Sequence, residues 1–170
     1  NDGDNDIVTA LQTTPIGVYW FENDGQGIFS DTIILSTSID CQGAKITDIN
    51  GDGNLDIMVS EFSGSIYWFQ GDGEGNFSTQ IKIDYDIPDA SSGADSYALD
   101  VGDIDLDGDI DILVSDSKFG TVLWLENTDG LGTFSEIIII HQLPAYPYSA
   151  KLYDLNQDGD LDVFTGRIFD

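Results

Sequence analysis

The sequence has few of the residues that most often build a scaffold or a catalytic site. Its 170 residues include one cysteine, one methionine, one histidine and four prolines. Because Cys41 has no second cysteine to pair with, no disulfide can form within the chain. The lone His141 follows four isoleucines, and no G-x-S-x-G motif accompanies it, so we expect no catalytic residues. No apolar run is long enough to cross a membrane, so we expect no membrane insertion.

Positive charge is also scarce. Five lysines and arginines stand against 32 aspartates and glutamates, for a formal net charge of −27. Such a surface repels nucleic-acid backbones and anionic lipid, which excludes nucleic acid as a partner. The chain is nevertheless 41% hydrophobic and 11% aromatic, too apolar for a disordered acidic tail. The composition therefore predicts a folded, strongly acidic protein.

Glutamate is rare among the acidic residues, with 27 aspartates against five glutamates. Simple charging of helix surfaces would favour glutamate, so helices do not explain the excess of aspartate. Fifteen of the aspartates lie in four short clusters. The clustering indicates a function other than solubility.

The clusters belong to an internal repeat. Equivalent aspartates, Asp2, Asp52, Asp107 and Asp158, recur at intervals of 50, 55 and 51 residues. A second element keeps the same period: VYWFENDGQGIFS, IYWFQGDGEGNFS and VLWLENTDGLGTFS. A period of this length is typical of repeat architectures. The complete acidic segments read DINGDGNLDIMVS, DIDLDGDIDILVS and DLNQDGDLDVFTG, and the chain opens with the second half of a fourth, DGDNDIVTA.

Each repeat predicts four short strands. In the second repeat they are Ala44 to Ile49, Leu55 to Phe62, Ile66 to Gln70 and Phe77 to Asp84, separated by turn residues. The third strand is apolar at successive positions, so both of its faces should be buried between neighbouring sheets. Four-stranded antiparallel sheets stacked at this period predict an all-β fold, a segment of a β-propeller.

These residues resemble the FG-GAP/VCBS repeat family, whose calcium-binding blades occur in integrin α-subunit heads. Three complete D-x-[DN]-x-D-G-x-x-D loops carry the resemblance, which spans essentially the whole chain. It implies a propeller, often of seven blades, on a secreted or cell-surface protein.

The acidic loops predict calcium sites on their own chemistry. Oxygen-bearing side chains stand at loop positions 1, 3, 5 and 9, a glycine at position 6 permits a sharp turn, and position 7 can add a backbone carbonyl. A set of five or six oxygen ligands suits Ca²⁺. The predicted ligands are Asp48, Asn50, Asp52, Asn54 and Asp56 in the second repeat, Asp103, Asp105, Asp107, Asp109 and Asp111 in the third, and Asp154, Asn156, Asp158, Asp160 and Asp162 in the fourth.

Electrostatics favours a bound cation over plain Asp/Gly turns. Two carboxylates about 4 Å apart repel by about 4 kcal/mol at an effective dielectric constant near 20. An EF-hand is excluded, because its position 12 needs glutamate and Val59, Val114 and Thr165 stand there. We expect three complete structural calcium sites, the tightest at Asp103 to Asp111, which has the most carboxylates. The first loop keeps only Asp2, Asp4 and Asp6, so we expect no complete site there.

The repeats divide residues 1–170, a single repeat domain, into about three blades. We place a partial blade at 1–40, blades at 41–95 and 96–146, and the start of another at 147–170. Because propellers have four to eight blades, we expect either a fragment of a larger propeller or self-association that completes one.

The function predicted is non-catalytic binding or adhesion in a secreted or cell-surface protein. Strand alternation puts the acidic loops on one face, so a protein or carbohydrate ligand should bind the opposite face, through Tyr85, Lys118, Phe119 and Tyr146. Two alternatives stay open: a propeller of a polysaccharide-degrading enzyme, and a lectin-like propeller. Trp20, Trp68 and Trp124 could stack on sugars in a lectin, but their place in doubly buried strands favours core packing.

Overall fold

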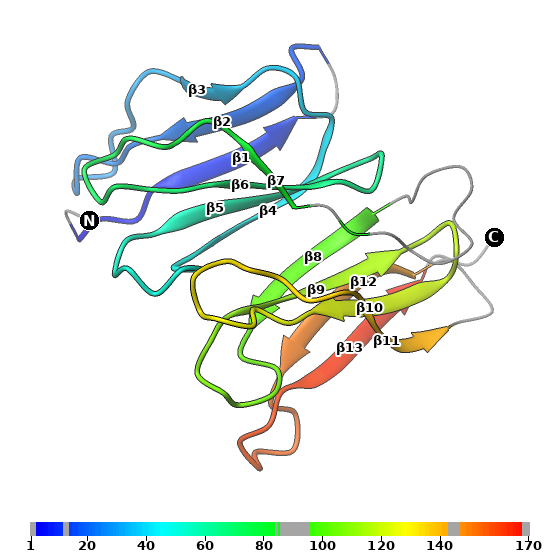
Figure 1. The fold of residues 1–170 in the computed structure, drawn as a ribbon. Helices are drawn as coiled ribbons and strands as arrows, with labels where there is room; N and C mark the ends of the chain where they lie inside the picture. The colour runs from blue at the N-terminus through cyan, green and yellow to red at the C-terminus, as the bar shows by residue number, and fades with distance from the viewer. Residues whose placement is uncertain (1–2, 12–13, 84, 86–95, 143–146, 168–170) are drawn as a thin grey trace.

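The computed structural model describes the chain except for residues 1–2, 12–13, 84, 86–95, 143–146 and 168–170. The prediction of an all-β fold is confirmed: the described residues form strands and no helix (Figure 1). In the described part, accordingly, no helix could span a membrane. The strands are β1 Ile7–Leu11, β2 Gly17–Phe21, β3 Ile33–Ser36, β4 Cys41–Thr47, β5 Asp56–Glu61, β6 Ile66–Phe69, β7 Ile81–Ile83, β8 Ser96–Gly102, β9 Asp111–Asp116, β10 Thr121–Leu125, β11 Ile138–Gln142, β12 Pro147–Tyr153 and β13 Asp162–Arg167.

The strands form four antiparallel sheets, which we call blades one to four. Blade one is β1-β2-β3, blade two β4-β5-β6-β7, blade three β8-β9-β10-β11 and blade four β12-β13. Within each blade the strands pair in chain order, as the repeat predicts. The first strands of consecutive blades are neighbours, with β4 contacting β8 and β8 contacting β12. The blades are therefore stacked in chain order, as in a β-propeller.

Two strands in blade two begin three or more residues away from the predicted start. The first strand begins at Cys41 rather than Ala44, and the fourth begins at Ile81 rather than Phe77. Phe77 instead forms an isolated bridge with Gly71, and the backbone N–H of Gln70 donates to Ser78 Oγ. This hydrogen bond to a side chain takes the place of a backbone hydrogen bond between the strands. The regular pairing of β6 with β7 therefore begins only after Ser78.

The hydrophobic core lies between the blades. As predicted, the third strand of each repeat (β2, β6 and β10) is largely buried on both faces. Val18, Ile66 and Leu123 of these strands have no exposed surface. The central cluster joins residues of blades two and three, among them Met58 and Ile112. Blades two and three thus bury both of their faces against neighbouring blades.

A tryptophan and a glycine form a recurring contact between consecutive blades. Trp20 of blade one lies against Gly75 in the β6–β7 turn, and Trp68 of blade two lies against Gly132 in the β10–β11 turn. Trp20 also meets the ring of Phe77 edge to face, with centroids 5.7 Å apart. Core packing is confirmed for Trp20 and Trp68, which are 8% and 7% exposed. Side chains of this size pack here only because the facing residue has no Cβ.

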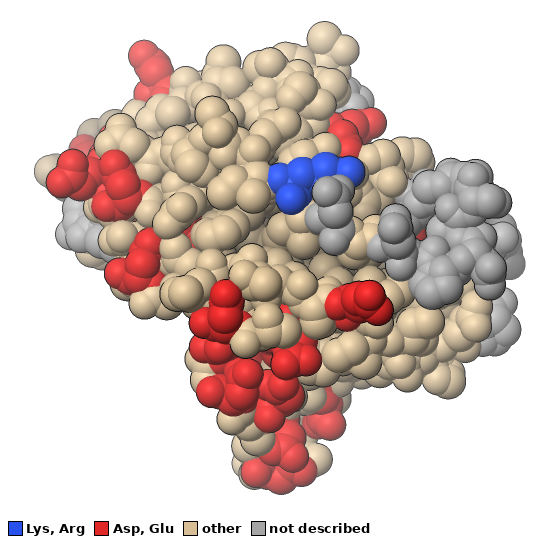
Figure 2. Space-filling view, in the orientation of Figure 1, with Lys and Arg blue, Asp and Glu red and all other residues tan. Residues whose placement is uncertain are grey.

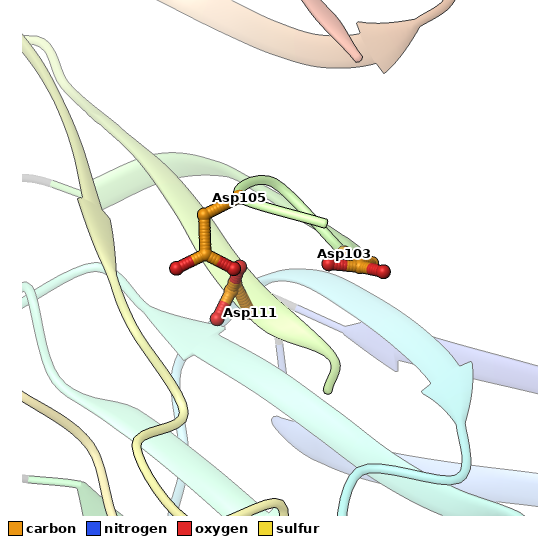
Figure 3. A group of neighbouring side chains, drawn as sticks. All are labelled: Asp103, Asp105 and Asp111. Atoms are coloured by element: carbon orange, nitrogen blue, oxygen red, sulfur yellow. The ribbon is translucent and has the colours of Figure 1, made fainter. Parts of the chain in front are cut away.

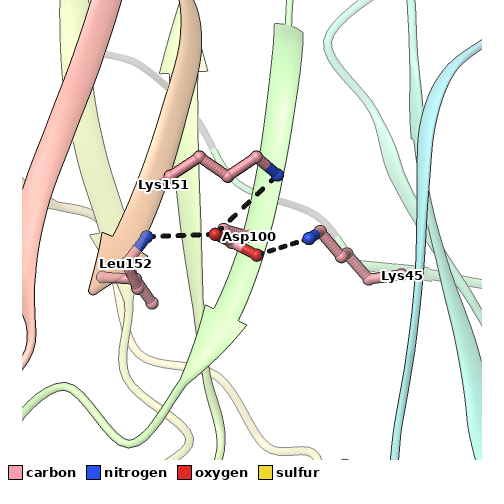
Figure 4. A network of polar contacts seen from close by, with 4 residues as sticks. All are labelled: Lys45, Asp100, Lys151 and Leu152. Carbon is pink, nitrogen blue, oxygen red and sulfur yellow. Dashed lines mark hydrogen bonds and ion pairs between the residues drawn. The ribbon is translucent and has the colours of Figure 1, made fainter. Parts of the chain in front are cut away.

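An ion-pair network links the first strands of three blades (Figure 4). Asp100 Oδ1 on β8 lies 2.7 Å from Lys45 Nζ on β4, and Asp100 Oδ2 lies 3.8 Å from Lys151 Nζ on β12. The backbone N–H of Leu152 also donates to Asp100 Oδ2, at 3.0 Å. Despite its burial, Asp100 has a lowered pKa, because these donors stabilise its charged form. One carboxylate thereby joins blades two, three and four.

The tryptophan–glycine contact predicts a position-dependent effect of one substitution. A Cβ at Gly132 would lie 2.7 Å from Trp68 Cζ3, and its φ of +92° is unfavourable for alanine. We expect Gly132→Ala to lower the free energy of unfolding by about 2–4 kcal/mol, the sum of backbone strain and overpacking. Thermal denaturation followed by circular dichroism measures the loss.

Gly27 provides the matched control. It holds the same place in the first repeat with a φ of +83°, and a Cβ there would meet no atom within 4 Å. Gly27→Ala should therefore cost only the backbone strain, about 1–2 kcal/mol. Equal losses in the two variants would show that the contact with tryptophan does not restrict the turn.

Candidate metal centre in the acidic loops

The acidic loops share one side of the molecule with the glycine-rich turns. The β4–β5, β8–β9 and β12–β13 connections emerge on the same side as the β2–β3, β6–β7 and β10–β11 turns, at the left and lower left (Figure 1). In Figure 2 acidic side chains gather over these loops. The shared face predicted from strand alternation is confirmed.

Two residues of each complete loop adopt left-handed backbone conformations. Position 6 is glycine, as expected, but position 4 also has a positive φ, including the non-glycine residues Leu106 at 65° and Gln157 at 64°. Such conformations cost of order 1–3 kcal/mol in ordinary residues. The fold therefore holds these loops in one tight shape.

The carboxylate at position 1 closes the loop around itself. Asp48 accepts backbone N–H groups from Asp52 and Gly53, at 3.1 and 2.8 Å. Asp154 accepts the equivalent pair in the fourth repeat, from Asp158 at 3.1 Å and Gly159 at 3.0 Å.

The third repeat departs from this pattern. Asp103 Oδ2 accepts from Gly108 at 3.1 Å, but Asp103 Oδ1 is buried and has no hydrogen-bond partner. A buried, unpartnered carboxylate oxygen is unfavourable unless a cation or another donor reaches it. This atom marks the third loop as the one that most needs a positive charge.

The carboxylate at position 9 ties two hairpins together. Asp111, with no exposed surface, accepts from the N–H of Ile104 at 2.9 Å and from that of Asn127 at 2.8 Å. Asp56 does the same with Ile49 and Gly71, at 3.2 and 2.8 Å. These aspartates therefore have a structural function that needs no ion. Each oxygen keeps a second lone pair, so the predicted ligation is still available to them.

The third loop brings carboxylates closest together among the described residues. Oxygens of Asp103, Asp105 and Asp111 lie within 4.8 Å of one another, and in Figure 3 Asp105 points toward Asp111 at the start of β9. A second group within the same distance comprises Asp105, Asp107 and Glu126. The sequence analysis missed Glu126, which follows β10 rather than lying in the loop. The available signal was a Glu or Gln at the same place in each repeat, Glu22 and Gln70.

The second and fourth loops mix carboxylates with an amide at position 3. Asn50 Nδ2 donates to Asp52 Oδ2 at 2.9 Å, so a neutral donor offsets that charge. In the fourth loop Asn156 Oδ1 accepts from the N–H of Asp158 at 2.9 Å. At position 7, Asn54, Asp109 and Asp160 each donate their N–H to the carboxylate at position 5.

The partial first loop keeps the structural carboxylate at position 9. Asp6 Oδ1 accepts from the N–H of Asn23 at 2.8 Å, the same tie that Asp56 and Asp111 make. Asp2 lies outside the described residues.

The pKa values of the aspartates follow this crowding. Burial, and then the charges of Asp105 and Asp107, raise the pKa of Asp111 to about 6. Desolvation followed by the charges of Asp107 and Asp103 raises the pKa of Asp109. In the second loop, by contrast, the hydrogen bond from Asn50 lowers the pKa of Asp52. The third loop is thus the most strained by like charge.

A cavity of about 500 Å³ lies between blades one and two, lined by residues that include Trp20, Ile46 and Phe77. Between blades two and three the corresponding region contains Ile49 at loop position 2, packed in the central core with Met58 and Trp68. The cavity thus lies where the next interface buries an isoleucine.

The residues predicted to bind a ligand on the opposite face are only partly available. Lys118 is exposed, with its Nζ 5.7 Å from the ring centre of Phe119. Phe119 and Tyr85 pack against the central core cluster. Tyr146 lies outside the described residues. Phe62, in the β5–β6 turn, is 42% exposed and was not predicted.

Comparison with known proteins identifies the repeat. A family model described as an FG-GAP-like repeat matches three overlapping stretches, residues 1–59, 48–114 and 103–165. Each match begins in one acidic loop and runs through the whole of the next. Among curated proteins, no sequence matches this chain.

The raised pKa values predict how the metal-free fold responds to pH. Because the folded pKa of Asp111 is about 6, above its ordinary value of 3.8, the folded state holds this proton more tightly than the unfolded state. Stability should therefore fall as pH rises from about 4 to about 7, by roughly 1–3 kcal/mol. The lowered values, such as that of Asp52, act below this window.

Urea denaturation between pH 4.5 and 7.5, on protein passed over a chelating resin, measures the slope. In excess calcium the slope should reverse, because ligating carboxylates must be deprotonated. A metal-free stability that rises with pH would contradict the strain assigned to the third loop.

Proposed function

The chain belongs to the FG-GAP-like repeat family, and from this we propose that it is a calcium-binding β-propeller module with a structural ion in each complete acidic loop. The observation that carries the proposal is Asp103 Oδ1, a buried carboxylate oxygen without a partner, beside the converging carboxylates of Asp105 and Asp111. A cation in this loop would satisfy that atom and neutralise the group.

The donor set favours Ca²⁺ over softer or smaller ions. The candidate ligands are carboxylates, amide oxygens and carbonyls, with no cysteine or histidine among them. Calcium accepts six to eight oxygens in flexible geometry, whereas Mg²⁺ demands a near-ideal octahedron. In the second and fourth loops the proposed ligands are Asp48, Asn50, Asp52, Asn54 and Asp56, and Asp154, Asn156, Asp158, Asp160 and Asp162.

The ion's contribution would be stability rather than chemistry. The position-9 aspartates Asp56 and Asp111 already bind the N–H groups of two hairpins. An ion attached to the same carboxylates would fix the acidic loop against the glycine-rich turn of its blade. The ion would also screen the repulsion among the acidic side chains, and so reduce the destabilisation that a net charge of −27 causes.

Calcium should therefore stabilise the folded protein. At a free concentration 100 times the dissociation constant, one site adds about 2.7 kcal/mol. For a chain of this size this corresponds to a rise in Tm of about 5–10 °C per site. Differential scanning calorimetry with and without calcium measures the rise, and isothermal titration calorimetry measures the stoichiometry.

Magnesium at the same concentration is the control for a general effect of ionic strength, and should raise Tm much less. Asp105→Ala should remove one binding event while leaving the others. A Tm that calcium does not change, with no heat of binding, would refute the calcium proposal.

We also propose a non-catalytic binding or adhesion function in a secreted or cell-surface protein. Extracellular calcium would keep even weak sites, with dissociation constants of about 10⁻⁴–10⁻³ M, occupied. A lectin built on Trp20, Trp68 and Trp124 is disfavoured, because the first two side chains are buried and Trp124 is half-buried.

The partner, a protein or carbohydrate, would bind the face opposite the acidic loops. Connections on that face vary from repeat to repeat, and loops on a rigid scaffold commonly carry binding functions. Phe62 offers exposed apolar surface there, and Lys118 is one of only five cationic residues. The alternative, a polysaccharide-degrading parent protein, would need catalytic groups, and none can be recognised from this sequence.

Alanine substitutions on the two faces test the position of the partner site. A ligand captured by calcium-loaded protein on a glycan array, or from a panel of purified extracellular proteins, should bind Phe62→Ala and Lys118→Ala at least tenfold more weakly, since few residues carry most binding energy. Leu131→Ala removes a side chain that is 68% exposed on the acidic-loop side and is the matched control. Loss of binding only in the control variant would move the site to the other face.

A further inference from the structure

Glu126 lies outside the acidic loop of the third repeat but close to two of its carboxylates. It follows β10, where its backbone N–H donates to Ser135 Oγ at 3.1 Å. Its half-buried carboxylate lies within 4.8 Å of oxygens of both Asp105 and Asp107. Asp105 is also a member of the group with Asp103 and Asp111. The two groups are thus one continuous set of carboxylates, drawn from two hairpins.

The equivalent residue of the second repeat also approaches its acidic loop, but it donates a hydrogen bond there instead of adding a negative charge. Gln70 follows β6, and its N–H likewise donates to a serine, Ser78 Oγ, at 3.0 Å. Its Nε2 donates to Asp52 Oδ2 at 3.3 Å, and Asp52 holds the same loop position as Asp107. The position after the third strand therefore reaches loop position 5 in both blades. Glutamine neutralises that carboxylate by a hydrogen bond, whereas glutamate has no proton to donate and adds a second negative charge.

We propose that Glu126 is an affinity-determining residue for the ion of the third loop, supplying a carboxylate from the neighbouring hairpin. This inference rests on the proposed calcium function. Two observations favour it over a plain surface cluster: the buried Asp103 Oδ1 without a partner in this loop, and the equivalent approach of the Gln70 side chain to Asp52 in blade two. The residue after the third strand would then set the relative calcium affinities of the sites, with the third loop binding calcium more tightly than the second.

Exchange of the two residues tests the proposal. Outer residues that support metal ligands typically change affinity by 10- to 100-fold when removed. In isothermal titration calorimetry of the whole chain, Glu126→Gln should weaken one calcium-binding step by at least tenfold. Gln70→Glu should strengthen another step by a similar factor, and a gain in affinity cannot arise from misfolding.

Glu22→Gln is the matched control. Glu22 has the same position in the first repeat, its N–H donates to Ser30 Oγ at 3.0 Å, and the acidic loop beside it lacks positions 1 and 3. This variant changes the net charge as Glu126→Gln does, and should leave every binding step within about twofold of the original protein.

Thermal denaturation separates ligation from simple packing. Removing the charge of Glu126 should raise Tm in metal-free protein, because repulsion is relieved, and should reduce the rise that calcium produces. A packing role would lower Tm in both conditions. If the original chain binds calcium and Glu126→Gln binds it equally well, the role of Glu126 is refuted and the calcium function stands. If the original chain binds no calcium, both proposals fail.

Discussion

The structure depends on a buried carboxylate that accepts hydrogen bonds from two hairpins at once. Asp56 and Asp111 each connect the start of an acidic loop to the turn after the third strand, and neither has exposed surface. A buried charge is stable only when its oxygens are satisfied, so the two backbone donors are a condition of folding rather than an addition to it. The hydrogen bonds fix the two hairpins of blade two, and those of blade three, relative to one another, and they bring the acidic loop beside the glycine-rich turn.

The same arrangement explains why negative charge becomes concentrated. Once a position-9 carboxylate is buried, the remaining acidic side chains of the loop project into a small volume around it. In the second loop Asn50 and Gln70 donate to Asp52 and relieve the crowding. The third loop has carboxylates at the equivalent places, and there burial, together with the charges of Asp105 and Asp107, raises the pKa of Asp111 to about 6. Structural and electrostatic requirements therefore conflict most in the third loop, and a cation is the simplest means of reconciling them.

Much of the fold follows from the sequence because the pattern repeats. The period fixes the strand order within each blade, and the continuous apolar third strands, such as Ile66–Phe69, indicate burial on both faces. The candidate ligands follow from their spacing in the loop. Glu126 does not, because its approach to Asp105 depends on how two hairpins fold together rather than on separation along the chain. The left-handed Leu106 was also unpredictable, since nothing in a leucine side chain favours that conformation.

The tryptophan–glycine contact gives the first two interfaces a direction. Trp20 reaches forward from blade one to Gly75, and Trp68 reaches forward from blade two to Gly132, so the two surfaces of a blade are complementary rather than alike. Such head-to-tail contacts permit growth by addition of identical units, because each new unit presents the surface that the next one requires. Gene duplication could thus lengthen or shorten this architecture in whole steps of about fifty residues without any redesign of the joints.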